Sequence, residues 1–167
     1  MNDESEIVNL DDCPMKPALL VGAPIAFFLT LFPLGFPLVA IGGFAATTSF
    51  IFKFKVRIEL KYGMKIAILA CLIGFGASTL LYDLLWALFD YRIGFETYIE
   101  FLQQMAESYP PSSGDPLRES IELLKEQSFG FGVVIQQLLT IFVASGIGGA
   151  VGGALATFIF RKGALAQ

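Results

Sequence analysis

Residues 127–160 read QSFGFGVVIQQLLTIFVASGIGGAVGGALATFIF and contain no charged side chain. A helix needs about 20 apolar residues to cross a bilayer, so this run predicts a spanning helix. Its second half places small residues four positions apart in two adjacent stripes. The first stripe is Ala144, Gly148, Gly152 and Ala156, and the second is Ser145, Gly149, Gly153 and Thr157. Small residues let helices approach closely in lipid, so these stripes predict a tight helix contact, either within one chain or between two chains.

The rest of the chain has the same character. Residues 17–52 and 66–82 also lack charged side chains, and hydrophobic residues make up 55% of the chain against 16% charged residues. Mean hydropathy is +0.69. Soluble domains carry about 25% charged residues, so the composition predicts an all-α integral membrane protein.

The uncharged run at 17–52 is too long for one span, and Pro33, Gly35 and Pro37 supply a break within it. We therefore predict a four-transmembrane-helix bundle with spans at about 18–32, 38–54, 65–89 and 131–160, in a membrane domain of residues 17–162. Residues 1–16 and 163–167 are predicted to be cytoplasmic tails, and residues 90–128 an outer helical cap. The alternative for residues 18–52 is a re-entrant pair or one long tilted helix.

Charge predicts the orientation of the spans. The loop at 53–65 carries five basic residues and one acidic residue, and a second basic pair follows the last span. With both termini cytoplasmic, eight Lys and Arg residues lie inside and three outside, as the positive-inside rule requires. The aromatic residues Trp86 and Tyr91 are expected where a span meets the opposite headgroup layer. The predicted interface anchors are Trp86, Tyr91, Lys53, Lys55, Arg57, Arg161 and Lys162.

The outer segment is expected to form two helices separated by a loop at 110–114. The first has apolar residues at helical spacing, namely Phe95, Ile99, Leu102 and Ala106. The second is expected to begin at Pro116 with Asp115 as its cap, and its apolar residues are Leu117, Ile121 and Leu124. These stripes are expected to lie on the outer membrane surface or to fold over the mouth of the bundle. The alternative is a docking surface for a partner.

Composition also excludes several functional classes. The chain has no histidine, which removes the commonest general base and metal ligand. The net charge of -4 argues against nucleic-acid binding. Cys13 and Cys71 have no spaced partner that would predict a disulfide or a metal site. We therefore expect no catalytic residue, no cofactor and no metal.

Three polar residues and several more glycines are the remaining site candidates. Asp83 is the only acidic residue in the third span, and an ionisable group within a span is a functional candidate unless it reaches interfacial water. Gln136 and Gln137 belong to the same outer third of the bundle and are expected to pair with Asp83 or with each other. Further helix-packing positions are predicted at Gly42, Gly43, Gly74 and Gly76, which offer small faces in the second and third spans.

With the spans placed, residues 17–162 resemble small bacterial polytopic membrane proteins that are classed as domains of unknown function. The resemblance rests on residues 41–46 before a basic loop, a glycine-bearing third helix at 74–76, a helical outer segment and a glycine-rich last span. It implies a place in the bacterial inner membrane, and it implies no activity or ligand.

We expect a non-enzymatic membrane protein, an accessory, scaffolding or assembly subunit whose partners are the lipid bilayer and either other membrane subunits or a second copy of itself. The alternative is a small transporter or channel with a polar site near Asp83. A permeation path lined by glycine is a weaker possibility, because the stripes bear few groups that can replace the hydration shell of an ion.

Overall fold

The computed structural model describes residues 13–31, 35–56, 58–109 and 111–160, although the side chains at 35–37 and 111–115 lie outside the description. Six helices and no strand occur in these ranges. They are α1 (Lys16–Thr30), α2 (Gly35–Phe54), α3 (Leu60–Phe89), α4 (Phe95–Ser108), α5 (Pro111–Glu126) and α6 (Phe131–Phe160). The protein is therefore all-helical in the described part, as the composition predicts.

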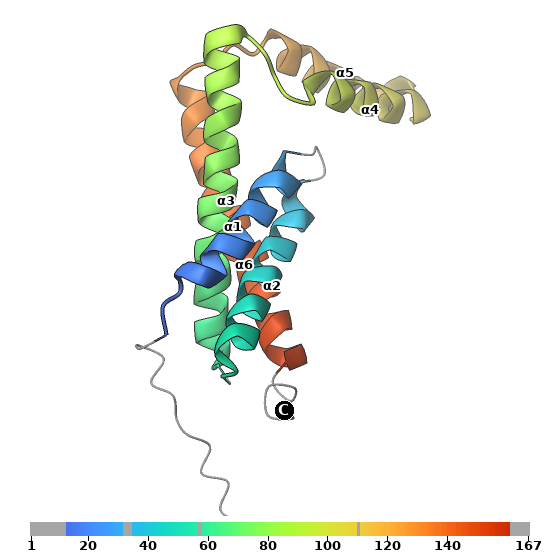
Figure 1. Cartoon of the computed structure of the whole chain (residues 1–167). Coiled ribbons are helices and arrows are strands. Elements are labelled where there is room, and N and C mark those ends of the chain that lie inside the picture. Colours follow the sequence, from blue (N-terminus) through green and yellow to red (C-terminus); the bar gives the residue numbers. More distant parts are fainter. Residues whose placement is uncertain (1–12, 32–34, 57, 110, 161–167) are drawn as a thin grey trace, which may run out of the picture.

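Four of the helices form a bundle. Helix α6 packs against α2 and α3, and α1 packs against the same two helices from the other side. Figure 1 shows that α3 and α6 run the full height of the bundle, whereas α1 and α2 accompany only one half of it. Helices α3 and α6 have 30 residues each and are long and apolar enough to cross a membrane. Helix α1 and the apolar part of α2 are shorter.

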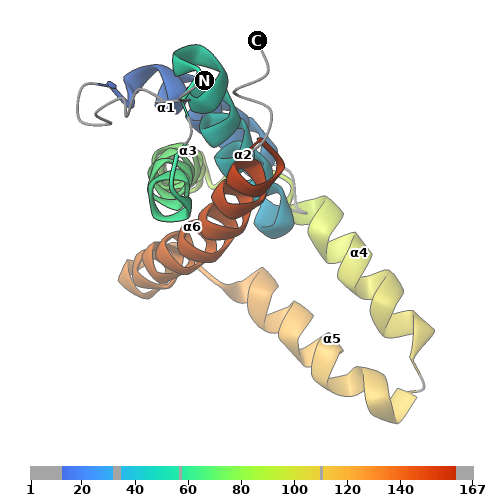
Figure 2. The same ribbon diagram turned by 90° about the horizontal axis from the view of Figure 1, so that it is seen from below.

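Helices α4 and α5 form a separate feature that we call the arm. They lie side by side, and Figure 2 shows them extending away from the bundle. Their apolar stripes face each other: Ile99 and Ala106 of α4 meet Ile121 of α5, and Phe95, Leu102, Leu117 and Leu124 surround this contact. The two apolar stripes thus pack against each other and form the core of the arm. Of these residues, Phe95 also lines a cavity at the end of the bundle, as the expected position over the bundle mouth requires.

The opposite end of the bundle gathers the basic residues, and we call it the basic end. The start of α1, the end of α2 and the start of α3 form one apolar cluster there, with Phe50 and Ile66 fully buried in it. Lys53, Lys55, Lys61 and Lys65 flank this cluster along the chain, at the end of α2, in the link that follows it and in the first two turns of α3. The start of α1, the end of α2, the start of α3 and the end of α6 all lie at this end, because α1 runs antiparallel to α2 and α3 runs antiparallel to α6.

Two helices begin earlier than predicted. Helix α2 begins at Gly35 and includes Pro37 in its first turn, where the missing N–H has no helical partner in any case. Helix α3 begins at Leu60, so Lys61 and Lys65 are helical and the basic loop is shorter than expected. Residues 32–34, with Pro33, lie outside the described residues.

The predicted start of the second arm helix is wrong. Helix α5 begins at Pro111 and contains Pro116 in its interior, so Asp115 does not precede the helix as a cap. The loop expected at 110–114 is reduced accordingly, and Pro110 lies outside the described residues. Pro116 has no N–H, so α5 lacks one backbone hydrogen bond in its first turns.

Candidate functional site

A cavity of about 480 Å³ opens at the end of the bundle that carries the arm. Its walls come from the end of α1, the second half of α3, the start of α4 and the first half of α6. The volume lies within the range of about 300–1,000 Å³ typical of small-molecule sites. The described side chains that line it include no charged group. They are Thr30, Leu31, Phe75, Ser78, Thr79, Tyr82, Ile93, Phe95, Tyr98, Gln136, Gln137 and Thr140, with Gly94 contributing backbone.

The cavity exists because α1 stops before α3 does. Thr30, the last residue of α1, and Ser78 of α3 share a hydrogen bond of 2.7 Å between their hydroxyl oxygens. Helix α3 then continues for eleven residues to Phe89, which is about 16 Å at 1.5 Å per residue. Above this hydrogen bond, α3 and α6 lack a cover from α1 and α2, and Figure 1 shows the arm overhanging the uncovered side.

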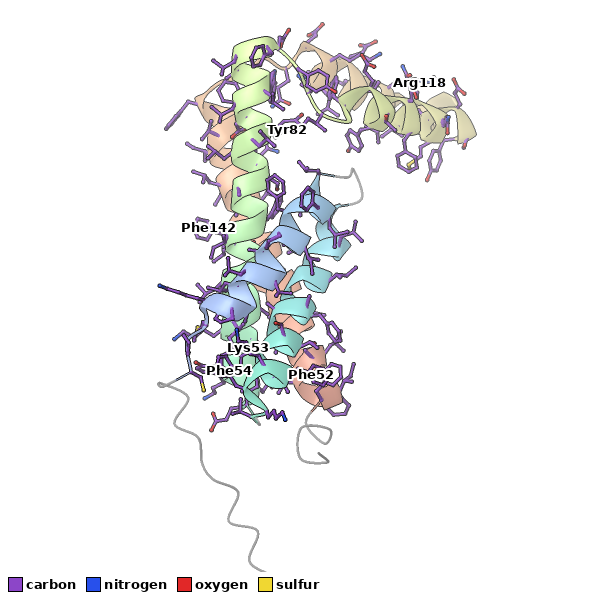
Figure 3. All side chains as sticks on the ribbon, viewed as in Figure 1. Phe52, Lys53, Phe54, Tyr82, Arg118 and Phe142 are labelled. Atoms are coloured by element: carbon purple, nitrogen blue, oxygen red, sulfur yellow. The ribbon has the colours of Figure 1, made fainter. Side chains whose placement is uncertain are left out.

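Hydrogen-bonding groups converge on the cavity from two helices. Helix α6 contributes Gln136, Gln137 and Thr140, and α3 contributes Thr79 and Tyr82. Figure 3 shows Tyr82 pointing toward the space between α3 and the arm. Amide and hydroxyl groups both donate and accept hydrogen bonds. The cavity can therefore bind a polar molecule without requiring it to carry a formal charge.

Two of the three predicted polar residues meet directly. The side chain of Gln137 hydrogen-bonds the Asp83 carboxyl group, and Gln137 is the member of this pair that lines the cavity. One oxygen of each group, Asp83 Oδ1 and Gln137 Oε1, is shielded from solvent and has no partner among the described atoms. Gln136 lines the same cavity and is exposed. The pair retains unused acceptors beside the cavity, and buried polar oxygens without partners are costly.

Sequence reasoning missed Arg92, which fixes the start of the arm. Its guanidinium group lies 4.2 Å from the ring centroid of Trp86 and 4.5 Å from that of Phe95. It donates hydrogen bonds to the carbonyl oxygens of Leu124, at 2.9 Å, and Gln127. Arg92 thus joins α3, α4 and the end of α5. In the sequence, Arg92 stands between the aromatic residues Tyr91 and Phe95, in a short link that ends at Gly94.

The two small-residue stripes of α6 contact different helices of the same chain. A Cβ atom added at Gly149 would lie 2.7 Å from Cα of Ile68, and one at Gly153 would lie 2.6 Å from the carbonyl oxygen of Gly63. Both partners belong to α3. On the other stripe, Gly148 faces Val39 and Gly152 faces Ala40, both in α2. Each stripe therefore packs against one neighbouring helix, the first against α2 and the second against α3.

The remaining packing glycines divide into two groups. Gly42 approaches Ala26 of α1, Gly43 approaches Ala67 and Gly149, and Gly74 approaches α1 at Ala23 and Ala26. Ser145 is fully buried in the stripe that faces α3. Gly76 has nothing within 4 Å of an added Cβ, so the packing role expected for it is not found in this chain.

The predicted anchors also divide. Trp86 is only 6% exposed and is covered by Tyr82, Phe129 and Arg92, so its ring packs within the chain. Tyr91 is exposed, as are Lys53 and Lys55. Arg57, Arg161 and Lys162 lie outside the described residues.

The described polar side chains of the cavity can donate and accept hydrogen bonds. Within the described residues, no three His, Cys, Asp or Glu side chains gather in a way that could hold a metal ion. Cys13 and Cys71 are both buried and free.

Comparison with protein-family models, with curated proteins and with solved structures found no match to this chain.

Proposed function

We propose that the chain crosses the bilayer with four segments, α1, α2, α3 and α6, with its basic end in the cytoplasm and its arm outside. Four crossings return both termini to one side, and the basic residues on that side agree with the positive-inside rule. The exposed apolar side chains along α3 and α6, such as Phe142, support lipid contact. Figure 3 shows Phe142 pointing away from the bundle.

The short hairpin of α1 and α2 gives this arrangement a functional consequence. Helix α1 has 15 residues, about 22 Å, and the hydrocarbon core is about 30 Å thick. With Lys16 at the cytoplasmic boundary, α1 ends inside the outer leaflet, where the cavity begins. In transporters, irregular backbone at membrane depth is tolerated where it lines a cavity.

The function that the geometry supports best is non-enzymatic binding and passage of a small neutral polar solute, as in a small transporter or channel. The observation that carries this proposal is the cavity of about 480 Å³ lined by hydroxyl and amide side chains and no described charge. Such a lining can replace water around a polyol through hydrogen bonds, whereas it cannot balance the charge of an ion. Gln137, whose amide group lines the cavity, would orient the solute at the wall.

The test is solute flux into phosphatidylcholine vesicles that contain the purified chain, with glycerol and sorbitol as probes and light scattering as the readout. Thr79→Val and Gln137→Leu are expected to lower the protein-dependent flux about tenfold, because each removes a hydrogen bond worth about 1–1.5 kcal/mol from the cavity wall. Thr48→Val is the matched control, since Thr48 lies in α2 and does not line the cavity. Equal flux in protein-containing and empty vesicles would refute the proposal.

A second function is favoured by a different feature, an apolar groove of about 530 Å³ between α1 and α3. Its lining includes three small residues, Ala23, Gly74 and Ala77, and three large apolar residues, Phe27, Phe28 and Ile73. A groove of small residues admits a helix of another membrane protein, because close approach drives association in lipid. The protein would then be an accessory subunit that uses α1 and α3. The α6 stripes are occupied within the chain and would not supply this contact.

Ala77→Leu tests the accessory role, because it fills the groove. It is expected to abolish any stoichiometric complex that native mass spectrometry detects after gentle extraction. Ala87→Leu makes the same change on the same helix away from the groove and is expected to preserve the complex. If the complex survives Ala77→Leu, the groove is not the binding surface.

A further inference from the structure

Helix α4 carries more apolar surface than its contact with α5 uses. At 100° per residue, its apolar side chains cover a continuous sector of about 160°. One part of the sector, centred on Ile99 and Leu102, faces α5. The other part is a second stripe formed by Tyr98, Phe101, Met105 and Tyr109, of which the three aromatic residues are 41–54% exposed. We call this stripe the aromatic face.

Helix α5 extends the aromatic face with uncharged residues. Because α4 and α5 run antiparallel with their apolar stripes in contact, the helical period places Pro116, Ser120 and Leu123 on the same side of the arm as the aromatic face. All three are exposed, and Leu123 is 64% exposed. This side of the arm therefore presents no charged side chain from the described part of either helix.

The charged residues of the arm lie on the opposite side. The same period places Glu96 and Glu107 of α4 with Arg118 and Lys125 of α5. Figure 3 shows Arg118 on the side of the arm that faces away from α1 and α2, and side-chain rings project from α4 on the other side. A helix that separates its faces in this way and ends its apolar stripe in tyrosines is typical of the interface of a bilayer.

The position of the arm agrees with this assignment. Tyr98 lines the same cavity as Thr79 and Tyr82, which lie 13–16 residues beyond Ile66, or about 20–24 Å along α3. That height falls in the outer leaflet of a core about 30 Å thick. Figure 1 shows α4 running across the direction of α3, so its long axis would follow the membrane plane. Of the described helices, α5 is the one that packs along α4, and Phe101 and Tyr109 of the aromatic face are 54% and 50% exposed.

We infer that the aromatic face is a lipid-binding surface that lies on the outer leaflet of the bilayer, with the charged side of the arm toward water. Arg92 fixes the arm at this height, because it joins α3 to both arm helices. This inference rests on the membrane placement in the proposed function, but it does not depend on solute passage. The arm then rests on the lipid surface beside the bundle and holds the mouth of the cavity at that surface.

The test uses the full chain in phosphatidylcholine vesicles whose acyl chains are brominated near the headgroup. Phe101→Trp and Gln103→Trp each add one tryptophan to α4, two positions apart and about 160° apart around the helix. Fluorescence quenching by the brominated lipid, after subtraction of the Trp86 signal, is expected to be at least about twofold stronger at position 101 than at position 103. Equal quenching at the two positions would overturn the inference.

Phe142→Trp provides the control for membrane placement, because Phe142 points outward from α6 and is exposed. Quenching at position 142 without quenching at position 101 leaves the spans in the membrane and rejects the lipid-binding face. No quenching at either position rejects both the membrane placement and the inference. Protection of position 101 from aqueous acrylamide that rises with protein concentration, without quenching by lipid, assigns the face to a second copy and also rejects the inference.

Discussion

Gly149→Ala is expected to destabilise the folded bundle by about 1–3 kcal/mol, the usual cost of overpacking a well-packed contact. The added Cβ would lie 2.7 Å from Cα and 2.8 Å from N of Ile68. These are backbone atoms, so no side-chain rotation relieves the clash and α3 must move away from α6. The free energy of unfolding, measured by denaturant titration in mild detergent, reports the change.

Gly146→Ala is the matched control because it makes the same substitution one turn earlier in α6. Nothing lies within 4 Å of the Cβ that it adds, so its expected effect is a gain of up to about 1 kcal/mol from helix propensity. A gain at both positions would show that α6 does not approach α3 as closely as the structure has it.

The pair Gly149→Leu with Gly153→Leu extends this prediction to its largest effect. An added Cβ at Gly153 would lie 2.6 Å from the carbonyl oxygen of Gly63, and that oxygen already accepts a hydrogen bond from Thr47 at 3.0 Å. The double variant is therefore expected to lose the contact between α6 and α3 and to yield no folded monomer. A folded double variant would show that the stripe is not a packing surface.

Arg92→Ala is expected to release the arm from the bundle. It removes the contacts with the Trp86 and Phe95 rings and the two hydrogen bonds to the end of α5. Together these contacts oppose local opening of the arm by about 2–4 kcal/mol, since each is worth about 0.5–3 kcal/mol. Amide hydrogen exchange in residues 117–126 should accelerate about 30-fold or more, while exchange in α6 stays unchanged.

Arg92→Lys separates charge from geometry at the same position. Lysine keeps the positive charge, but it lacks the planar group that stacks between two rings and donates to two carbonyl oxygens at once. Its expected effect is therefore close to that of alanine. If lysine restores slow exchange, charge alone holds the arm and the geometric account of Arg92 is wrong.

The helices themselves were predictable, because their causes are local. The uncharged runs and the four-residue spacing of small residues identified α3 and α6 and the faces on which α6 packs. The errors came where two local rules competed. Pro116 suggested the start of a helix, but α5 begins at Pro111, which also suits the first helical position because its missing N–H has no partner there.

The site was predictable only in part. Gln137 and Asp83 were expected to pair from their similar depth, and the structure has their side chains hydrogen-bonded, with Gln137 lining the cavity. The cavity also depends on two contacts between segments that lie far apart in the chain. Helix α1 must stop at Thr30 against Ser78, and Tyr98 must return from the arm to the same place. Contacts between residues 48 positions apart carry no local pattern.

The helical fold, the positions of the long apolar helices and the small faces of α6 could all be predicted from the sequence, because backbone hydrogen bonding and side-chain period act within a few residues. Three features became visible only in the folded chain: one stripe of α6 meets α2 and the other meets α3, Trp86 is buried under Arg92, and α4 keeps a second apolar face exposed. These outcomes depend on which surfaces meet across the whole chain, and that choice is made by the packing of all the helices together.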